Sequence, residues 1–374
     1  MNAVPHFSQT YAEARERFAA AARACGAQQF RHVHPGARGA EGEELSMDFA
    51  LLGRADAAGL LLLISATHGV EGFCGSGCQV ALLHDTAFLD AVDRSGVAVL
   101  MLHALNPYGF SHLRRVNEDN ADLNRNFVDF TDPLPVNAAY AELHSLLLPA
   151  AWPAPADSEA TLRAWIARHG PKAYQAAVSG GQYQFPDGMF YGGGEPAWSN
   201  RILRAVLREH ALTRETLAWI DVHTGLGPRG KAEKIYAGTN QPADEARSRH
   251  WWGDDVTSFL DGSSLSAPLT GINGFAARDE CPRARFAGIA LEYGTYPIEQ
   301  VLEAFRSEHW LHNHPEAPAS QRREIKQHFR DMFYVDADDW KDMVYRQAVD
   351  ACTKAVDRLA RTPAHAKCPE SLIR

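Results

Sequence analysis

Apolar runs of the kind found in buried strands alternate along this chain with segments of helical periodicity. Four segments read as buried strands because they are almost continuously apolar. These are residues 60–67, 97–103, 216–222 and 286–292, and more polar strands are predicted at 28–34 and 46–52. Strands that alternate with helices predict an α/β fold in which helices cover both faces of one sheet.

The predicted helices and the segments between them indicate how the chain is organised. Helices are expected at residues 7–25, 75–84, 137–148, 158–178, 198–210 and 340–359, with one or two more in the C-terminal third. Residues 106–126 form a long polar loop, and so long a loop in a compact domain is usually functional. We find no repeat, low-complexity tract or linker. The chain is therefore expected to form one catalytic domain over residues 1–374, with insertions at about 128–215 and a helical extension at about 300–374.

Candidate metal ligands follow two of the predicted strands. His68 and Glu71 come directly after the run LLLLISAT, and His223 follows the strand at 216–222. A catalytic zinc ion takes three ligands of the imidazole and carboxylate type and keeps a position for water. Carboxyl ends of strands are also where open α/β sheets bind ligands. Asp221, two residues before His223, could orient this ligand as an outer-shell carboxylate. A histidine and a glutamate three residues apart also occur by chance, so the pairing with His223 is what favours a zinc site.

The polar loop and the last predicted strand add groups that could act on a substrate. A guanidinium such as that of Arg125, next to Asn124, can bind a carboxylate through two hydrogen bonds. Arg115 could stabilise an oxyanion, whereas Glu292 could be a general base. The alternatives are structural ion pairs. The arginines could pair with Glu118, Asp119 and Asp122, and Glu292 could pair with Arg285.

The composition excludes several classes of partner. The 374 residues are 45% hydrophobic and 22% charged, with a formal net charge of −9, as in a soluble globular enzyme and unlike a protein that binds nucleic acid or anionic membranes. No apolar run is long enough to span a bilayer, and the N-terminus does not read as a secretory signal, so we expect a cytoplasmic protein. The scattered cysteines are expected to be reduced, with Cys74 and Cys78 in the core. The others are Cys25, Cys281, Cys352 and Cys368.

In this order, the motifs THGVEG, NPYGF, RVNEDNADLNRNF, DVHTG and LEYGT resemble those of the zinc carboxypeptidase superfamily. That superfamily includes the metallocarboxypeptidases and the aspartoacylase and succinylglutamate desuccinylase branch. The motifs cover residues 66–295, and the chain looks closest to a bacterial branch defined as a domain of unknown function. The resemblance implies a mixed, mostly parallel eight-stranded sheet flanked by helices. It implies one zinc ion per chain, a general base and an arginine that polarises the substrate carbonyl, while an asparagine and an arginine hold the substrate carboxylate. The implied residues are His68, Glu71 and His223 for zinc, Glu292 as base, Arg115 on the carbonyl, with Arg114 as its alternative, and Asn124 and Arg125 on the carboxylate.

The sequence departs from the digestive carboxypeptidases in the segment ahead of Glu292. Those enzymes carry a mobile tyrosine there, whereas residues 239–290 of this chain contain none. We therefore expect Tyr183, Phe190, Tyr191, Arg283 and Arg285 to complete the substrate pocket. Tyr191 belongs to the glycine-rich passage 180–196, which is either a lid over the pocket or a packed insertion.

The expected activity is that of a zinc metallohydrolase, a carboxypeptidase-like metallopeptidase that cleaves an amide bond next to a free carboxylate. An N-acyl amino acid amidohydrolase of the aspartoacylase type and a non-catalytic metal-binding protein remain alternatives. The expected partners are therefore small peptides or N-acyl amino acids.

Overall fold

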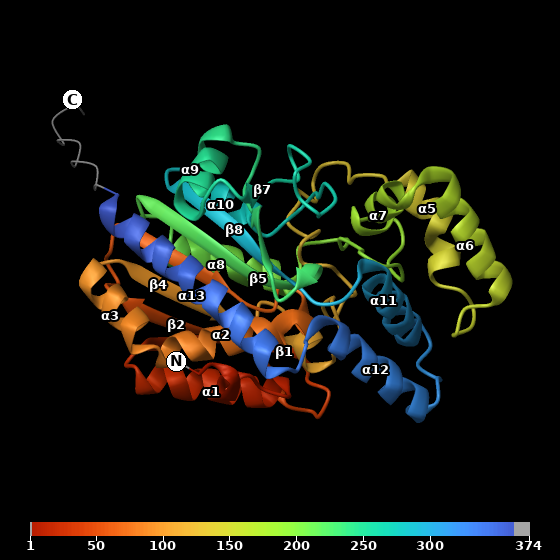
Figure 1. Ribbon diagram of the computed structural model, residues 1–374, viewed down its shortest axis with the longest axis horizontal. Coiled ribbons are helices and arrows are strands. Elements are labelled where there is room, and N and C mark those ends of the chain that lie inside the picture. The colour runs from red at the N-terminus through yellow and green to blue at the C-terminus, as the bar shows by residue number, and fades with distance from the viewer. Residues whose placement is uncertain (1, 363–374) are drawn as a thin grey trace.

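The computed structural model describes residues 2–362, so Cys368 and the end of the expected helical extension lie outside the described residues. A single sheet of eight strands runs through the molecule in the order β1-β2-β4-β3-β5-β8-β6-β7 (Figure 1). The strands are β1 (Gln28–Arg38), β2 (Glu44–Gly53), β3 (Gly59–Ile64), β4 (Ala98–His103), β5 (Thr216–Arg229), β6 (Ala232–Tyr236), β7 (Val256–Thr257) and β8 (Arg285–Gly294).

The centre of the sheet is parallel, and its flanks are antiparallel except for the short parallel pair of β6 with β7. β4, β3, β5 and β8 pair in parallel, whereas β1 with β2, β2 with β4, and β6 with β8 are antiparallel. β3 and β4 are almost entirely apolar because both of their faces are buried. The prediction of a mixed, mostly parallel eight-stranded sheet flanked by helices is confirmed.

Helices cover both faces of the sheet. Side chains of successive strand residues point to opposite faces. In β2, Asp48 pairs with Arg15 of α1 at 3.0 Å, whereas Phe49 stacks on Phe30, whose other neighbour is His210 of α8. The two helices therefore lie on opposite faces. The helices are α1 (Tyr11–Ala24), α2 (Gly72–His84), α3 (Thr86–Ser95), α4 (Pro107–Ser111), α5 (Ala138–Leu147), α6 (Ala156–His169), α7 (Pro171–Ser179), α8 (Trp198–His210), α9 (Pro242–Trp252), α10 (Phe275–Glu280), α11 (Ile298–Asn313), α12 (Ala319–Phe333) and α13 (Asp338–Arg361), with short 3-10 turns η1 (Val4–His6) and η2 (Gly69–Glu71).

A second group of helices lies beyond the carboxyl ends of the central strands. α5, α6 and α7 from the middle of the chain gather there with α11 and α12, on the side of the molecule opposite α3 (Figure 1). Their apolar side chains form a cluster of their own, which includes Leu143, Phe305 and Phe333. This group forms one side of the pocket described below.

Some predicted elements differ from the structure. The single helix expected at residues 158–178 is two helices, because Gly170 adopts a left-handed φ of 88° and Pro171 starts α7 without a backbone N–H to donate. Cys74 and Cys78 are buried in the core as predicted, and the five cysteines of the described residues are free thiols. Among residues 2–362, no helix combines the length and the apolar character needed to cross a membrane.

Candidate metal centre

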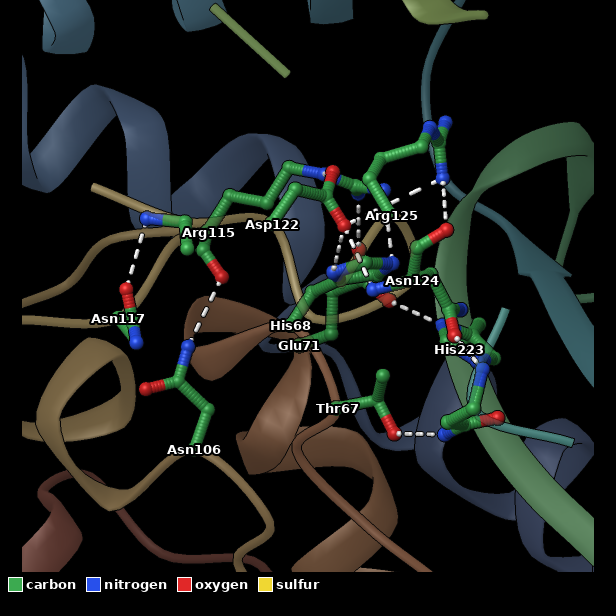
Figure 2. A network of polar contacts seen from close by, with 12 residues as sticks. Thr67, His68, Glu71, Asn106, Arg115, Asn117, Asp122, Asn124, Arg125 and His223 are labelled. Atoms are coloured by element: carbon green, nitrogen blue, oxygen red, sulfur yellow. Dashed lines mark hydrogen bonds and ion pairs between the residues drawn. The ribbon is translucent and has the colours of Figure 1, made fainter. Parts of the chain in front are cut away.

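Three buried side chains meet where the central strands end. His68 follows β3, Glu71 ends η2, and His223 lies in β5, which pairs with β3 in parallel. One donor atom from each lies within 4.8 Å of the other two, and Figure 2 shows the three side chains directed toward one another. Gly69 lets the turn between them pack against α4, since a Cβ there would lie 2.0 Å from the Gly109 carbonyl carbon.

The His223 ring is oriented by a carboxylate behind it. Its Nε2 lies 2.9 Å from Asp221, and its Nδ1 faces Glu71 at 3.1 Å. The Thr67 hydroxyl and the Asn273 amide also donate to Asp221, at 2.9 and 2.7 Å. Burial opposes protonation of this ring, but the two carboxylates raise the pKa of His223 well above its usual value. This arrangement presents Nδ1 to the cluster, as outer-shell carboxylates do for metal-bound histidines.

His68 is in the state that a metal ligand requires. Its Nε2 lies 2.7 Å from Arg115 Nη2, and because a guanidinium only donates, Nε2 presents its lone pair. Burial and the charge of Arg115 hold the pKa of His68 well below its usual value, so the ring is neutral. Among residues 2–362 its buried Nδ1 has no hydrogen-bond partner, and it lies 3.6 Å from Asp122.

Glu292 stands next to this cluster on the neighbouring strand. β8 runs parallel to β5 with Glu292 in register with His223. Its Oε1 accepts a hydrogen bond of 3.0 Å from Leu226 N–H. Burial and the nearby charge of Glu71 raise the pKa of Glu292 to about 8. The alternative ion pair with Arg285 is wrong, because that arginine lies at the opposite end of β8, next to Thr216.

The residues present fit a divalent metal ion. Two imidazoles and a carboxylate are the donor set of catalytic zinc sites, and all three side chains are at least 96% buried. The second carboxylate, Glu292, adds negative charge to the same buried volume. An additional cation here would relieve the repulsion between these two carboxylates, so both the donor types and the local charge favour a metal ion.

Arg115 reaches the ligands from the polar loop. Its guanidinium donates to Glu71 at 3.1 Å and to Asp122 at 2.8 Å, in addition to its contact with His68. The backbone carbonyls of Arg114 and Arg115 accept hydrogen bonds from Val70 and Gly69, which fixes the loop to the metal-ligand turn. Arg115, and not Arg114, therefore faces the site.

Arg114 points the other way and joins a separate buried ionic group. It donates to Glu308 of α11 at 2.9 Å and to Asn120 at 3.0 Å, and Lys326 of α12 donates to the same glutamate at 2.7 Å. Although burial opposes ionisation, these cations lower the pKa of Glu308 to about 2. We call Arg114, Asn120, Glu308 and Lys326 the Glu308 cluster.

Arg125 and Asn124 line the same pocket farther along the loop. Arg125 is 2% exposed and donates to the carbonyl oxygens of Asn124, at 2.8 Å, and of Ser179. Its buried Nε has no hydrogen-bond partner among the described residues, and its closest acidic contact is Asp122 at 4.0 Å. A buried cation with an open donor is suited to receive an anion.

Three of the predicted substrate residues lie elsewhere. The backbone carbonyl of Tyr191 accepts a hydrogen bond from Asp122 N–H, whereas Phe190, also expected from the glycine-rich passage, does line the pocket. Arg285 pairs with Glu215 at 4.0 Å at the amino end of β8, and Arg283 is exposed just before this strand begins. About seven residues of extended strand separate Arg285 from Glu292, a distance on the order of 20 Å, and Arg283 precedes Arg285 in the chain. The sequence did not reveal this because a one-dimensional separation does not say at which end of a strand a residue lies.

The glycine-rich passage is a packed insertion. Gly181 lies against Arg125, where a Cβ would be 2.6 Å from Cδ, and its φ of 94° suits glycine. The Tyr183 hydroxyl donates to the Arg125 carbonyl at 2.6 Å. Asn273 and Phe305 also line the pocket, but neither belongs to a local motif from which the sequence could have predicted this. Asp122 had been considered only as a structural partner of the arginines.

These features define an α/β protein with a buried His–Glu–His cluster at the carboxyl ends of its parallel strands. The chain belongs to the family described as "Protein of unknown function (DUF2817)", whose model matches residues 7–347. No curated protein matches the chain.

Solved structures of other proteins match this structure at low sequence identity. Carboxypeptidase A from Helicoverpa armigera is 12% identical, with a TM-score of 0.45, over 92% of this chain and 74% of that one. Bovine thrombin-activatable fibrinolysis inhibitor, solved with a tick carboxypeptidase inhibitor, is 11% identical, with a TM-score of 0.46, over 95% and 98%. A metallo-carboxypeptidase from Burkholderia cenocepacia is 12% identical, with a TM-score of 0.41, over 89% and 68%.

Proposed function

We propose that the protein is a zinc-dependent hydrolase that cleaves an amide bond next to a free carboxylate, as a carboxypeptidase does. The observation that carries this proposal is the convergence of His68, Glu71 and His223 within 4.8 Å, with Glu292 on the adjacent strand. Structural zinc sites usually take four protein ligands, whereas catalytic sites take three. The three-residue set with a neighbouring carboxylate therefore favours catalysis over a structural role.

The proposed ligands are the two histidines and Glu71. A zinc ion bound by them would polarise a carbonyl group and make a coordinated water more acidic. The lone pair of His68 Nε2 and the Glu71 carboxylate now contact Arg115. With these donors given to a metal ion, Arg115 would be free to donate to the carbonyl oxygen of the substrate and to stabilise its negative charge in the transition state.

Glu292 is the proposed general base. A carboxylate whose pKa lies near neutral pH can take a proton from water and return it later in the reaction. In the proposed hydrolysis, water adds to the amide carbon, Glu292 receives the proton, and the C–N bond breaks as Glu292 passes the proton to the leaving nitrogen. The products are a carboxylic acid and an amine.

Arg125 is proposed to hold the carboxylate of the substrate. Its open Nε lies in a buried setting, where a charge-assisted hydrogen bond is stronger than at the surface. Such anchoring would present the amide to Glu292 in one orientation. Positioning of this kind can lower a barrier by up to about 7–11 kcal/mol in well-oriented reactions.

A substrate library tests the proposal. Dipeptides and N-acyl amino acids would be incubated with the full-length protein as purified, after chelation, and after addition of zinc. We expect hydrolysis that chelation abolishes and zinc restores. Hydrolysis that is insensitive to chelation, or zinc binding with no hydrolysis of any amide, would contradict the proposed activity, and the second result would favour a metal-binding protein.

A further inference from the structure

Outside its charged centre, the pocket has two apolar walls that belong to different parts of the molecule. The first wall comes from β6 and the segment 258–273, and its buried members Ile235, Phe259 and Ile272 form one small cluster. The second comes mainly from α11 and α12 and belongs to the helical cluster beyond the sheet. Its pocket-lining members are Phe190, Val301, Leu302, Phe305 and Phe333.

The first wall adjoins the residues proposed to bind the carboxylate. Asn124 Oδ1 accepts a hydrogen bond of 3.0 Å from the backbone N–H of Asn273, next to Ile272. Gly271 lies against the Arg125 carbonyl, where a Cβ would be 2.5 Å from the oxygen. A molecule anchored on Arg125 would thus place the side chain next to its carboxylate against this wall.

The second wall adjoins the residues proposed to act on the carbonyl. The Arg115 guanidinium lies over the rings of Phe190 and Phe305, at 5.1 and 5.4 Å from their centres. Phe333 is close to Gly225, since a Cβ there would lie 3.0 Å from its ring and 3.9 Å from Glu292 Oε1. The acyl half of a substrate would therefore lie against α11 and α12.

The charges that line the pocket allow one carboxylate and no more. Its arginines are Arg115 and Arg125, and Arg115 is matched by Asp122 and Glu71. Arg125 has the open donor, and the described lining residues include no lysine or further arginine. A second substrate carboxylate away from the metal ligands would find only Arg115, which pairs with Asp122 at 2.8 Å and is proposed to hold the carbonyl oxygen, so its desolvation would be costly. The two walls also hold no acidic side chain that could pair with a basic substrate.

We propose that the substrates are monocarboxylates with an apolar group on each side of the scissile amide, such as an apolar amino acid that carries an apolar acyl group or an apolar residue at its nitrogen. This inference rests on the proposed function and narrows it. It disfavours diacid substrates of the kind that N-acyl aspartates represent. Hydrolysis would consume one water and yield an apolar carboxylic acid and an apolar amino acid.

A matched set of compounds tests this proposal on the zinc-replete, full-length protein. N-hexanoyl derivatives of leucine, aspartate and lysine vary one side of the amide, and N-hexanoyl- and N-acetyl-leucine vary the other. Each would be measured for kcat/KM and, by calorimetry, for binding. We expect hexanoyl-leucine to exceed the aspartate and lysine compounds by at least about tenfold in both quantities, and acetyl-leucine by a similar factor. Equal values, or a preference for aspartate or lysine, would overturn the proposal.

The binding measurement separates this inference from the proposed activity. Selective binding of hexanoyl-leucine without turnover would support the apolar walls and contradict the hydrolase. Turnover without a preference for apolar groups would support the hydrolase and contradict the apolar walls.

A charge placed in the first wall gives a second test. Ala267 lines the pocket in the segment 258–273, and an Ala267→Lys variant should shift the ratio of aspartate to leucine turnover upward by about tenfold or more. Ala267→Met is the uncharged control of similar length and should keep the preference for leucine. An unchanged ratio in a folded Ala267→Lys protein would contradict the placement of this wall.

Discussion

Two buried groups of charged residues lie close together in this molecule, and they are balanced differently. In the Glu308 cluster, one carboxylate meets Arg114 and Lys326 at 2.9 and 2.7 Å, and its pKa falls to about 2. In the candidate metal centre, Glu71 and Glu292 lie near each other, and the pKa of Glu292 rises to about 8 because burial and the neighbouring carboxylate oppose its ionisation.

The difference distinguishes a structural role from a functional one. A matched ionic group is satisfied by its own partners, and removing one of them leaves a charge buried without compensation. An unmatched group has spare negative charge and lone pairs that an external cation can use. Perturbed carboxylates in a pocket are therefore candidates for chemistry. Arg114 and Arg115 are adjacent in the sequence, yet one belongs to each group.

The largest effect is expected from removing a ligand of the metal centre. His68→Ala takes away one of three donors, so both zinc binding and turnover should be lost. Metal content after dialysis, measured beside hydrolysis of a peptide or N-acyl substrate, checks this. His314→Ala, a partly buried histidine at the end of α11, is the control and should leave both unchanged. Full zinc content in folded His68→Ala would break the assignment of this group as a metal centre.

Replacing the base separates chemistry from metal binding. Glu292→Gln keeps the shape of the side chain but cannot take a proton, so turnover should fall by about 10²–10⁴-fold while zinc is retained. The exposed Glu209→Gln on α8 is the matched control and should behave as wild type. Wild-type turnover in metal-replete Glu292→Gln would remove Glu292 from the mechanism.

The matched group should respond in stability. Glu308→Ala leaves Arg114 and Lys326 buried without their carboxylate, so the free energy of unfolding should fall by about 3–5 kcal/mol. Urea unfolding measures this loss. Glu324→Ala on α12 is exposed and should change the free energy of unfolding by less than about 0.5 kcal/mol. A Glu308→Ala protein as stable as wild type would show that the cluster is not structurally important.

The two carboxylates should also give opposite pH dependences of stability in the metal-free protein. The folded pKa of Glu292 is raised, so its contribution is present at low pH and is lost as the pH rises from about 4.5 to about 8. The folded pKa of Glu308 is lowered, so its contribution is present at neutral pH and is lost as the pH falls from about 4.5 to about 2. Each change should be on the order of a few kcal/mol.

Urea midpoints measured from a pH near the Glu308 pKa of about 2 to a pH above the Glu292 pKa of about 8 follow both limbs. Glu292→Gln should flatten the alkaline limb, and Glu308→Gln should flatten the acidic one. The same effect from both variants on one limb would contradict the contrast between the two groups.

The smallest effect is expected from Arg285. It lies at the amino end of β8, far from both groups, so Arg285→Ala should leave kcat/KM within about twofold of the wild-type value. A large rise in KM with unchanged stability would place Arg285 in substrate binding after all.

The sequence predicts the central part of this molecule well, for physical reasons. Strands buried on both faces are largely apolar, so their runs predict β3, β4, β5 and β8. His68, Glu71, His223 and Glu292 are polar residues at the ends of such runs, and this position is why the sequence singles them out as candidate site residues. The sequence does not predict β6 or the edge strand β7, because these strands are short and lack a continuous apolar run.

Apart from Phe190, the walls of the pocket could not be predicted, since they depend on how distant segments meet. Phe305 lies in an ordinary amphipathic helix, and nothing local indicates that α11 would face Arg115. Asn273 is one polar residue in a loop, yet it supports Asp221 at 2.7 Å. Arg283 and Arg285 are close to Glu292 in sequence, which favoured them as substrate-binding residues. They lie at the amino end of β8, however, whereas Glu292 lies toward its carboxyl end.

The central claim is that His68, Glu71 and His223 hold one divalent ion beside Glu292. A crystal of the zinc-loaded protein, measured at the zinc absorption edge, tests it most directly. We predict one anomalous peak per chain, at about 2.0–2.2 Å from a donor atom of each of the three residues. A peak at another position, or none between these side chains at full zinc loading, would contradict the account.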